Sequence, residues 1–209
     1  MPSHSVIGAA VGRRSLVRVT PHAAPPTARA LPRVLVVCTG NVCRSPFAEL
    51  LLRSRVPGLE IASRGIDALE GSAMEGQMRA LLEARDVDAS GFRARQVEAA
   101  DVDADLVLTM SARQRAYLLD EFPQIARRTG LLGAVPALQG MAEEQGGLSP
   151  SLIAAWTRRP MGRQHEVPDP YRRPLEAARA TADLLESLVD PLAALLTGIA
   201  AAPAPPTPR

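Results

Sequence analysis

The chain has 209 residues, of which 46% are hydrophobic and 22% charged, a balance typical of a globular protein. All 24 basic residues are Arg, the formal net charge is only +2 and 3% of the residues are aromatic, which argues against a nucleic-acid-binding protein. No run approaches the ~20 apolar residues of a membrane span, and the two cysteines lie only five residues apart. This cysteine usage excludes a disulfide framework and fits a reducing compartment, so we expect a cytoplasmic protein. We also expect a monomer or a weak dimer.

Hydrophobic periodicity and turn residues divide the chain into a leader over 1–31, a domain over 32–199 and a tail over 200–209. The leader and the tail are rich in Ala and Pro and are predicted to be disordered. Within the domain, strands are expected at 34–37, 59–63, 105–110 and 131–132. Helices are expected near 46–55, 74–85, 111–121, 135–145, 150–158 and 175–196, with a Pro-rich loop at 160–174.

Strands that alternate with helices indicate a parallel sheet with helices on both faces. We therefore predict a single α/β domain with a doubly wound, four-stranded sheet.

The stretch from Cys38 to Pro46 carries the strongest chemical signal. Cys38 ends an apolar strand, a loop with Gly40 and Asn41 follows, and Ser45-Pro46 is expected to open a helix with a cap residue and a Pro at its first position. Loop N–H groups and a helix N-terminus form an anion site. The positive end of the helix dipole, the Arg44 guanidinium and the Ser45 hydroxyl all favour the thiolate form of Cys38, which can attack phosphorus. The alternative is a buried core thiol beside a surface Arg.

Cys38 to Pro46, with the apolar strand before it and Phe47-Ala48-Glu49 after it, resembles the active-site signature of the low-molecular-weight protein tyrosine phosphatases. The resemblance implies a flavodoxin-like sheet, Cys38 as the nucleophile, and phosphate binding by Arg44 and the loop N–H groups. It also implies that Ser45 stabilises the thiolate and that Asn41 holds the strained loop. The substrate-binding residues implied in this loop are Thr39, Gly40, Asn41, Val42, Cys43 and Ser45.

The same family uses a general acid Asp near the C-terminus, because a phenolate leaves more readily when it is protonated in the transition state. Val167-Pro168-Asp169-Pro170-Tyr171 resembles that acid loop. The resemblance implies that Asp169 is the acid and that Tyr171 forms an aromatic wall against the substrate ring. An ordinary Asp-Pro turn and a surface Tyr are the alternatives.

Two weaker matches concern the support of the loop. Ser63 resembles the family's Ser that hydrogen-bonds the loop Asn. The segment 90–96 resembles one in which a His often stands where this chain has Phe92. Because Phe92 cannot make the hydrogen bond of that His, we expect a shorter network around Asn41, and a structural role for Arg95.

Cys43 could pair with Cys38 on oxidation or simply pack the loop. No metal site is expected, since His4, His22 and His165 lack a ligand set, and no cofactor is implied. The Arg172-Arg173 pair after the acid loop predicts a basic entrance that favours acidic flanks on the substrate.

The resemblance implies a phosphomonoester hydrolase that acts on phosphotyrosine-type substrates through a cysteinyl-phosphate intermediate. Its partner would be a tyrosine-phosphorylated protein or a small aryl phosphate. One alternative is an arsenate reductase on the same fold, although a thioredoxin-linked enzyme would need resolving cysteines that are absent after Cys43. The other is a catalytically weak phosphotyrosine-binding module.

Overall fold

The computed structural model describes residues 32–200 and contains one sheet of four parallel strands in the order β2-β1-β3-β4. The predicted leader over 1–31 lies outside the described residues, as does the tail over 200–209 apart from Ala200, which ends the last helix. The strands are β1 (Arg33–Cys38), β2 (Glu60–Gly65), β3 (Leu106–Thr109) and β4 (Thr129–Leu131). The predicted four-stranded parallel α/β fold is confirmed.

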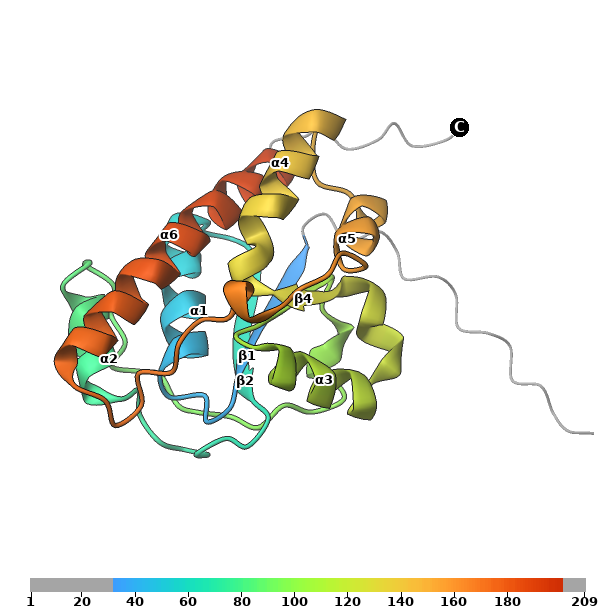
Figure 1. Ribbon diagram of the computed structural model, residues 1–209. Helices are drawn as coiled ribbons and strands as arrows, with labels where there is room; N and C mark the ends of the chain where they lie inside the picture. The colour runs from blue at the N-terminus through green and yellow to red at the C-terminus, as the bar shows by residue number, and fades with distance from the viewer. Residues whose placement is uncertain (1–31, 201–209) are drawn as a thin grey trace, which may run out of the picture.

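Within residues 32–200, six α-helices pack around this sheet: α1 (Arg44–Arg55), α2 (Gly76–Glu83), α3 (Ala112–Glu121), α4 (Val135–Gln145), α5 (Pro150–Trp156) and α6 (Leu175–Ala200). The long α6 contacts α1, α2 and α4 on one side of the molecule, and α3 lies on the other (Figure 1). Ser111 and Ser149 cap α3 and α5 with their side chains, as small hydroxyl residues commonly do.

Successive side chains of a strand point to opposite faces of the sheet, so a strand that is covered on both faces contributes to two cores. The central strands of this sheet do so. Val34, Val36 and Leu108 belong to the core that includes Leu51 and Leu52 of α1 and the inner face of α6. On the opposite face, Leu35, Val37 and Val107 pack with Leu118 of α3 and Ile125. The predicted helices on both faces are therefore present.

Two local predictions are wrong. First, α1 begins at Arg44, so Ser45 is inside the helix and does not cap it. Its hydroxyl is instead bonded to Asn41 and Cys38. Second, the fourth strand ends at Leu131 and includes Gly130. A Cβ at Gly130 would collide with the ring of Trp156, so the absence of a side chain lets α5 pack against this strand.

The loops that follow β1 and β3 and the loop that precedes α6 meet at one edge of the sheet. Val167 donates its backbone N–H to the carbonyl of Met110 at 2.9 Å, and Thr39 and Gln114 are joined by a hydrogen bond. Ligands of open α/β sheets bind at this carboxyl edge. Over residues 32–200, none of the helices is both long and apolar enough to cross a membrane.

Candidate active site

Residues 39–43 form a tight loop between β1 and α1. Asn41 is fully buried and has a left-handed backbone with φ +53°, a conformation that Asn tolerates better than most residues. Within the described residues, the backbone N–H groups of Thr39 to Cys43 donate to no protein acceptor. Together with the N-terminus of α1, they leave a cluster of unused donors suited to an anion.

The thiol of Cys38 lies at the end of β1, and both cysteines are free. The Nδ2 group of Asn41 lies 3.0 Å from the Oγ of Ser45, which lies 3.0 Å from the Sγ of Cys38. Because an amide nitrogen only donates, Ser45 accepts from Asn41 and its own hydrogen points toward Cys38. The sulfur of Cys38 thus has a hydroxyl donor beside it, and the carbonyl of Arg64, at 3.4 Å, is the more distant acceptor for the same hydroxyl.

Asn41 is held at both ends of its side-chain amide. Its Nδ2 group also donates to the Oγ of Ser63 at 2.8 Å, and its Oδ1 accepts from the backbone N–H of Arg95 at 2.8 Å. These two contacts fix the amide orientation, since one side offers an acceptor and the other a donor. The structure thus brings Ser63 to the loop as the resemblance implied, and it adds Arg95 through its backbone.

The network does not stop at Ser63. The hydroxyl of Ser63 donates to the Oε2 of buried Glu49 at 2.6 Å, and Arg53 lies 3.4 Å from the other carboxylate oxygen. Burial raises the pKa of Glu49 above its ordinary value of 4.5, against the lowering effects of Ser63 and Arg53. Glu49 ends this network, and Phe92 packs against the core. The expectation that the network is shorter than that of the family stays a prediction.

Arg44 joins the loop to the segment before α6. Its Nη2 lies 2.6 Å from the Oδ2 of Asp169, and its Nη1 donates to the carbonyl of Val167 at 3.1 Å. Within the described residues, the buried Nε of Arg44 has no hydrogen-bond partner. A buried donor without a partner is costly, and an oxyanion in the loop would supply the acceptor.

The acid loop leaves its carboxylate accessible. The side chain of Asp169 is 52% exposed, and its Oδ1 accepts from the backbone N–H of Tyr171 at 3.2 Å. The ring of Tyr171 is exposed, and the guanidinium of Arg172 lies 5.1 Å from its centroid.

Leu69, which sequence reasoning missed, is also exposed and donates its N–H to the carbonyl of Gly40 at 3.0 Å. Nothing in the sequence places Leu69 at the loop.

The remaining loop residues have structural contacts. The hydroxyl of Thr39 accepts from Gln114 at 3.0 Å, and Gln114 in turn accepts from the N–H of Met110 at 2.9 Å. The side chains of Val42 and Cys43 are buried. Burial is the largest of the effects that raise the pKa of Cys43 well above its ordinary value, so Cys43 remains a thiol.

Comparisons with known proteins agree with this geometry. The family described as low molecular weight phosphotyrosine protein phosphatase matches residues 33–136. The low molecular weight protein-tyrosine-phosphatase Wzb of Salmonella typhi is 34% identical over 155 residues, which cover 74% of this chain and 87% of that protein. The protein-arginine-phosphatase of Geobacillus stearothermophilus is 31% identical over 163 residues, covering 77% of this chain and 93% of that protein.

Solved structures show the same fold. The YwlE arginine phosphatase from Geobacillus stearothermophilus superposes with a TM-score of 0.63 at 30% identity, covering 79% of this chain and 93% of that one. Vibrio vulnificus Wzb in complex with benzylphosphonate gives a TM-score of 0.62 at 25% identity, covering 78% and 98% of the two chains. By these relationships, this chain belongs to the low molecular weight protein tyrosine phosphatase family.

Proposed function

We propose that the protein hydrolyses phosphotyrosine-type monoesters, in proteins or in small aryl phosphates, through a cysteinyl-phosphate intermediate and without a cofactor. This proposal rests on one observation: three functional groups lie around the loop whose backbone N–H groups, from Thr39 to Cys43, donate to no protein acceptor within the described residues. Cys38 supplies the sulfur, Arg44 a guanidinium with an unpartnered Nε, and Asp169 an accessible carboxyl group.

The chemistry proceeds in two steps. In the first, the Cys38 thiolate attacks phosphorus, the ester P–O bond breaks, and Asp169 gives its proton to the departing phenolate oxygen. In the second, Asp169 takes a proton from water, which attacks phosphorus, so that the S–P bond breaks and inorganic phosphate leaves. Arg44 and the loop N–H groups offset the charge on the three equatorial oxygens throughout.

The side chains around the entrance favour an aryl ester. Leu69 and Tyr171 have large, exposed side chains. The backbone N–H of Leu69 donates to Gly40 of the loop, and that of Tyr171 donates to Asp169. Both side chains can pack against the flat ring of an aryl ester. Arg172 and Arg173, both exposed, place positive charge beside the acid loop. This charge favours acidic flanks on the substrate, as the sequence predicted, and opposes a cationic leaving group.

Phosphoarginine is the second candidate substrate, because one relative and one similar structure are named as arginine phosphatases. Its guanidinium leaving group is positive, so the Arg pair at the entrance disfavours it. Arsenate reduction is not favoured, since these relatives are named as phosphatases and the sequence has no cysteine after Cys43.

The test is hydrolysis of p-nitrophenyl phosphate by the purified protein in the presence of a chelator. We expect activity that Cys38→Ser abolishes, and activity that survives this change would exclude the mechanism. Asp169→Ala should slow esters of poor leaving groups far more than esters of activated phenols, so equal losses would remove Asp169 as the acid. Parallel assays with phosphotyrosine and phosphoarginine peptides decide the substrate class, and a preference for phosphoarginine would overturn the charge argument.

A further inference from the structure

A cavity of about 660 Å³ borders the Glu49–Ser63 pair, between α1, β2 and the loop that follows Val87. We call it the Ser63 cavity. Its volume lies in the range of small-molecule sites, roughly 300–1,000 Å³. None of the proposed catalytic residues Cys38, Arg44 and Asp169 lines it, so it is separate from the phosphate cradle.

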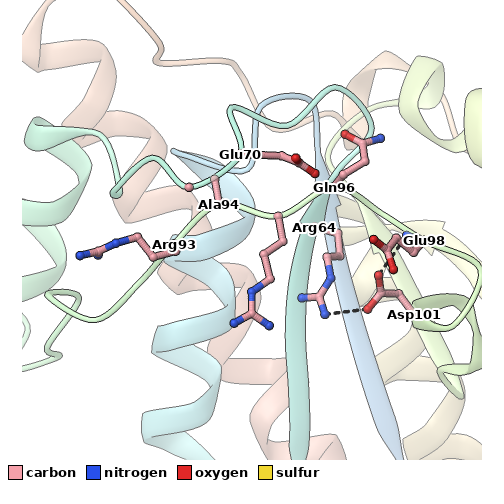
Figure 2. Close-up of a pocket in the computed structure, with 9 residues that line it drawn as sticks. Arg64, Glu70, Arg93, Ala94, Gln96, Glu98 and Asp101 are labelled. Atoms are coloured by element: carbon pink, nitrogen blue, oxygen red, sulfur yellow. Dashed lines mark hydrogen bonds and ion pairs between the residues drawn. The ribbon is translucent and has the colours of Figure 1, made fainter.

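A second cavity, of about 470 Å³, adjoins the first and shares Arg64, Arg93 and Arg95 with it. Three acids balance these arginines there, and the Nη2 of Arg64 lies 2.6 Å from Asp101. Figure 2 shows Arg64 turned toward Asp101, whereas Arg93 extends in the opposite direction, away from the acids. The surplus of positive charge therefore lies on the side of the Ser63 cavity.

Four arginines line the Ser63 cavity, against two acids that already have partners: Arg53, Arg64, Arg93 and Arg95 against Glu49 and Asp88. The carboxylate of Asp88 accepts from the N–H and hydroxyl of Ser90, at 2.8 and 3.1 Å, which lowers its pKa. Within the described residues, the guanidinium of Arg95 makes no hydrogen bond or ion pair, and Arg93 donates only to two backbone carbonyls. Both side chains retain unused donors.

The chemistry of these donors selects the ligand. A guanidinium presents paired N–H groups that match the oxygens of a phosphate or phosphonate. The cavity is much larger than a bare phosphate, and Phe92, Ile61 and Val87 contribute apolar lining. The matching ligand is a small dianion of the phosphate class that carries a flat apolar group.

Two residues that line this cavity also hold the catalytic loop. The hydroxyl of Ser63 accepts from the Nδ2 of Asn41, and the backbone N–H of Arg95 donates to the Oδ1 of Asn41. We propose that the Ser63 cavity is a second anion site for such a dianion, and that its occupation steadies the loop around Asn41. The site itself is independent of the proposed activity, whereas its regulatory meaning rests on the proposed function.

The test uses full-length protein in which Cys38 is alkylated with iodoacetate, so that the first anion site is blocked. Cys43 should not react, because it is a buried thiol of raised pKa. Phenylphosphonate is titrated by calorimetry, and inorganic phosphate in a parallel arm. We expect one equivalent of phenylphosphonate to bind, and Arg95→Gln to weaken binding at least about tenfold, the loss of one charge-assisted hydrogen bond. Arg127→Gln, a change at an exposed arginine in the turn before β4, should bind like the parent.

Absence of binding to the alkylated protein, or equal binding by Arg95→Gln, would overturn the site. Equal affinity for inorganic phosphate would overturn the requirement for a flat apolar group. In the alkylated protein of parent sequence, bound phenylphosphonate should also slow hydrogen exchange over residues 39–43, and binding without this protection would overturn the link to the loop. No step measures catalysis, so a failure of the proposed function leaves these outcomes readable.

Discussion

Ser63→Ala tests whether the buried network positions the catalytic loop. The change removes the acceptor for Asn41 and the short hydrogen bond to Glu49, leaving that carboxylate with Arg53 at 3.4 Å. A hydrogen bond to a charged group contributes about 1.5–3 kcal/mol and a neutral one about 1 kcal/mol. We expect the free energy of unfolding at neutral pH to fall by about 2–4 kcal/mol, as measured by urea denaturation.

The effect on catalysis follows from the backbone of Asn41. Its φ of +53° is costly for a residue other than Gly, by about 1–2 kcal/mol, and the side-chain anchors offset that cost. When one anchor is lost, the competent loop should become less populated by a comparable free energy. This corresponds to a loss of about 5–30-fold in kcat/KM for p-nitrophenyl phosphate.

Two further variants separate positioning from general damage. Ser187→Ala removes an exposed hydroxyl that bonds only within α6, and it should change stability by less than about 0.5 kcal/mol. Glu49→Gln in the Ser63→Ala background removes the buried carboxylate that has lost its hydrogen bond from Ser63, and it should recover stability but not kcat/KM. An unchanged kcat/KM in Ser63→Ala, or full recovery of it in the double variant, would refute positioning through Asn41.

Three other predictions concern titration, packing and substrate choice. Because the pKa of Glu49 is raised in the folded protein, ionisation of its carboxyl group opposes folding. The stability that the protonated group contributes is fully present below the ordinary pKa of 4.5, and it is lost as the pH rises through the pKa of the folded protein. Urea denaturation should therefore show Glu49→Gln gaining stability relative to the parent as the pH rises, and a constant difference would contradict the assignment. Gly130→Ala should cost about 1–3 kcal/mol by overpacking Trp156, whereas Gly140→Ala in α4, where a Cβ meets nothing within 4 Å, should be neutral or stabilising in the same assay. Arg172 has a left-handed backbone with φ +57°, and Asn is the replacement because it tolerates this conformation. Arg172→Asn should reduce the preference for acidic over neutral phosphotyrosine peptides about 2–5-fold at low salt, the effect of removing one exposed charge. The kcat/KM ratio measures this preference, and an unchanged ratio would show that Arg172 does not select substrates.

The sequence predicts this fold well because its strongest signals are local. The apolar strand that ends at Cys38, the Gly40-Asn41 loop and the following helix are consecutive, so their spacing determines their geometry. Strand and helix alternation then restricts the sheet to a parallel, doubly wound arrangement. Asp169 could be named only through resemblance to a family, because 125 residues separate it from Arg44 and no local pattern joins them.

The support of the loop could not be predicted, because it depends on contacts between distant segments. The donor to the Asn41 oxygen is the backbone N–H of Arg95, which any residue other than Pro would supply. The direct bond from Ser63 to Glu49 depends on how closely α1 lies against β2. One signal was available, since Glu49 lies one helical turn after Ser45 and thus on the same face of α1.

The contact between Arg44 and Asp169 has a consequence for the order of events in the proposed mechanism. In the structure, the Nη2 of Arg44 lies 2.6 Å from the Oδ2 of Asp169. A substrate phosphate carries two negative charges and matches the same guanidinium fork, so it competes with Asp169 for Arg44. Once displaced from Arg44, the carboxyl group of Asp169, which is already 52% exposed, is free to face the leaving-group oxygen. Substrate binding would thus release Asp169 from Arg44 before the step in which the proposed mechanism uses it as the acid.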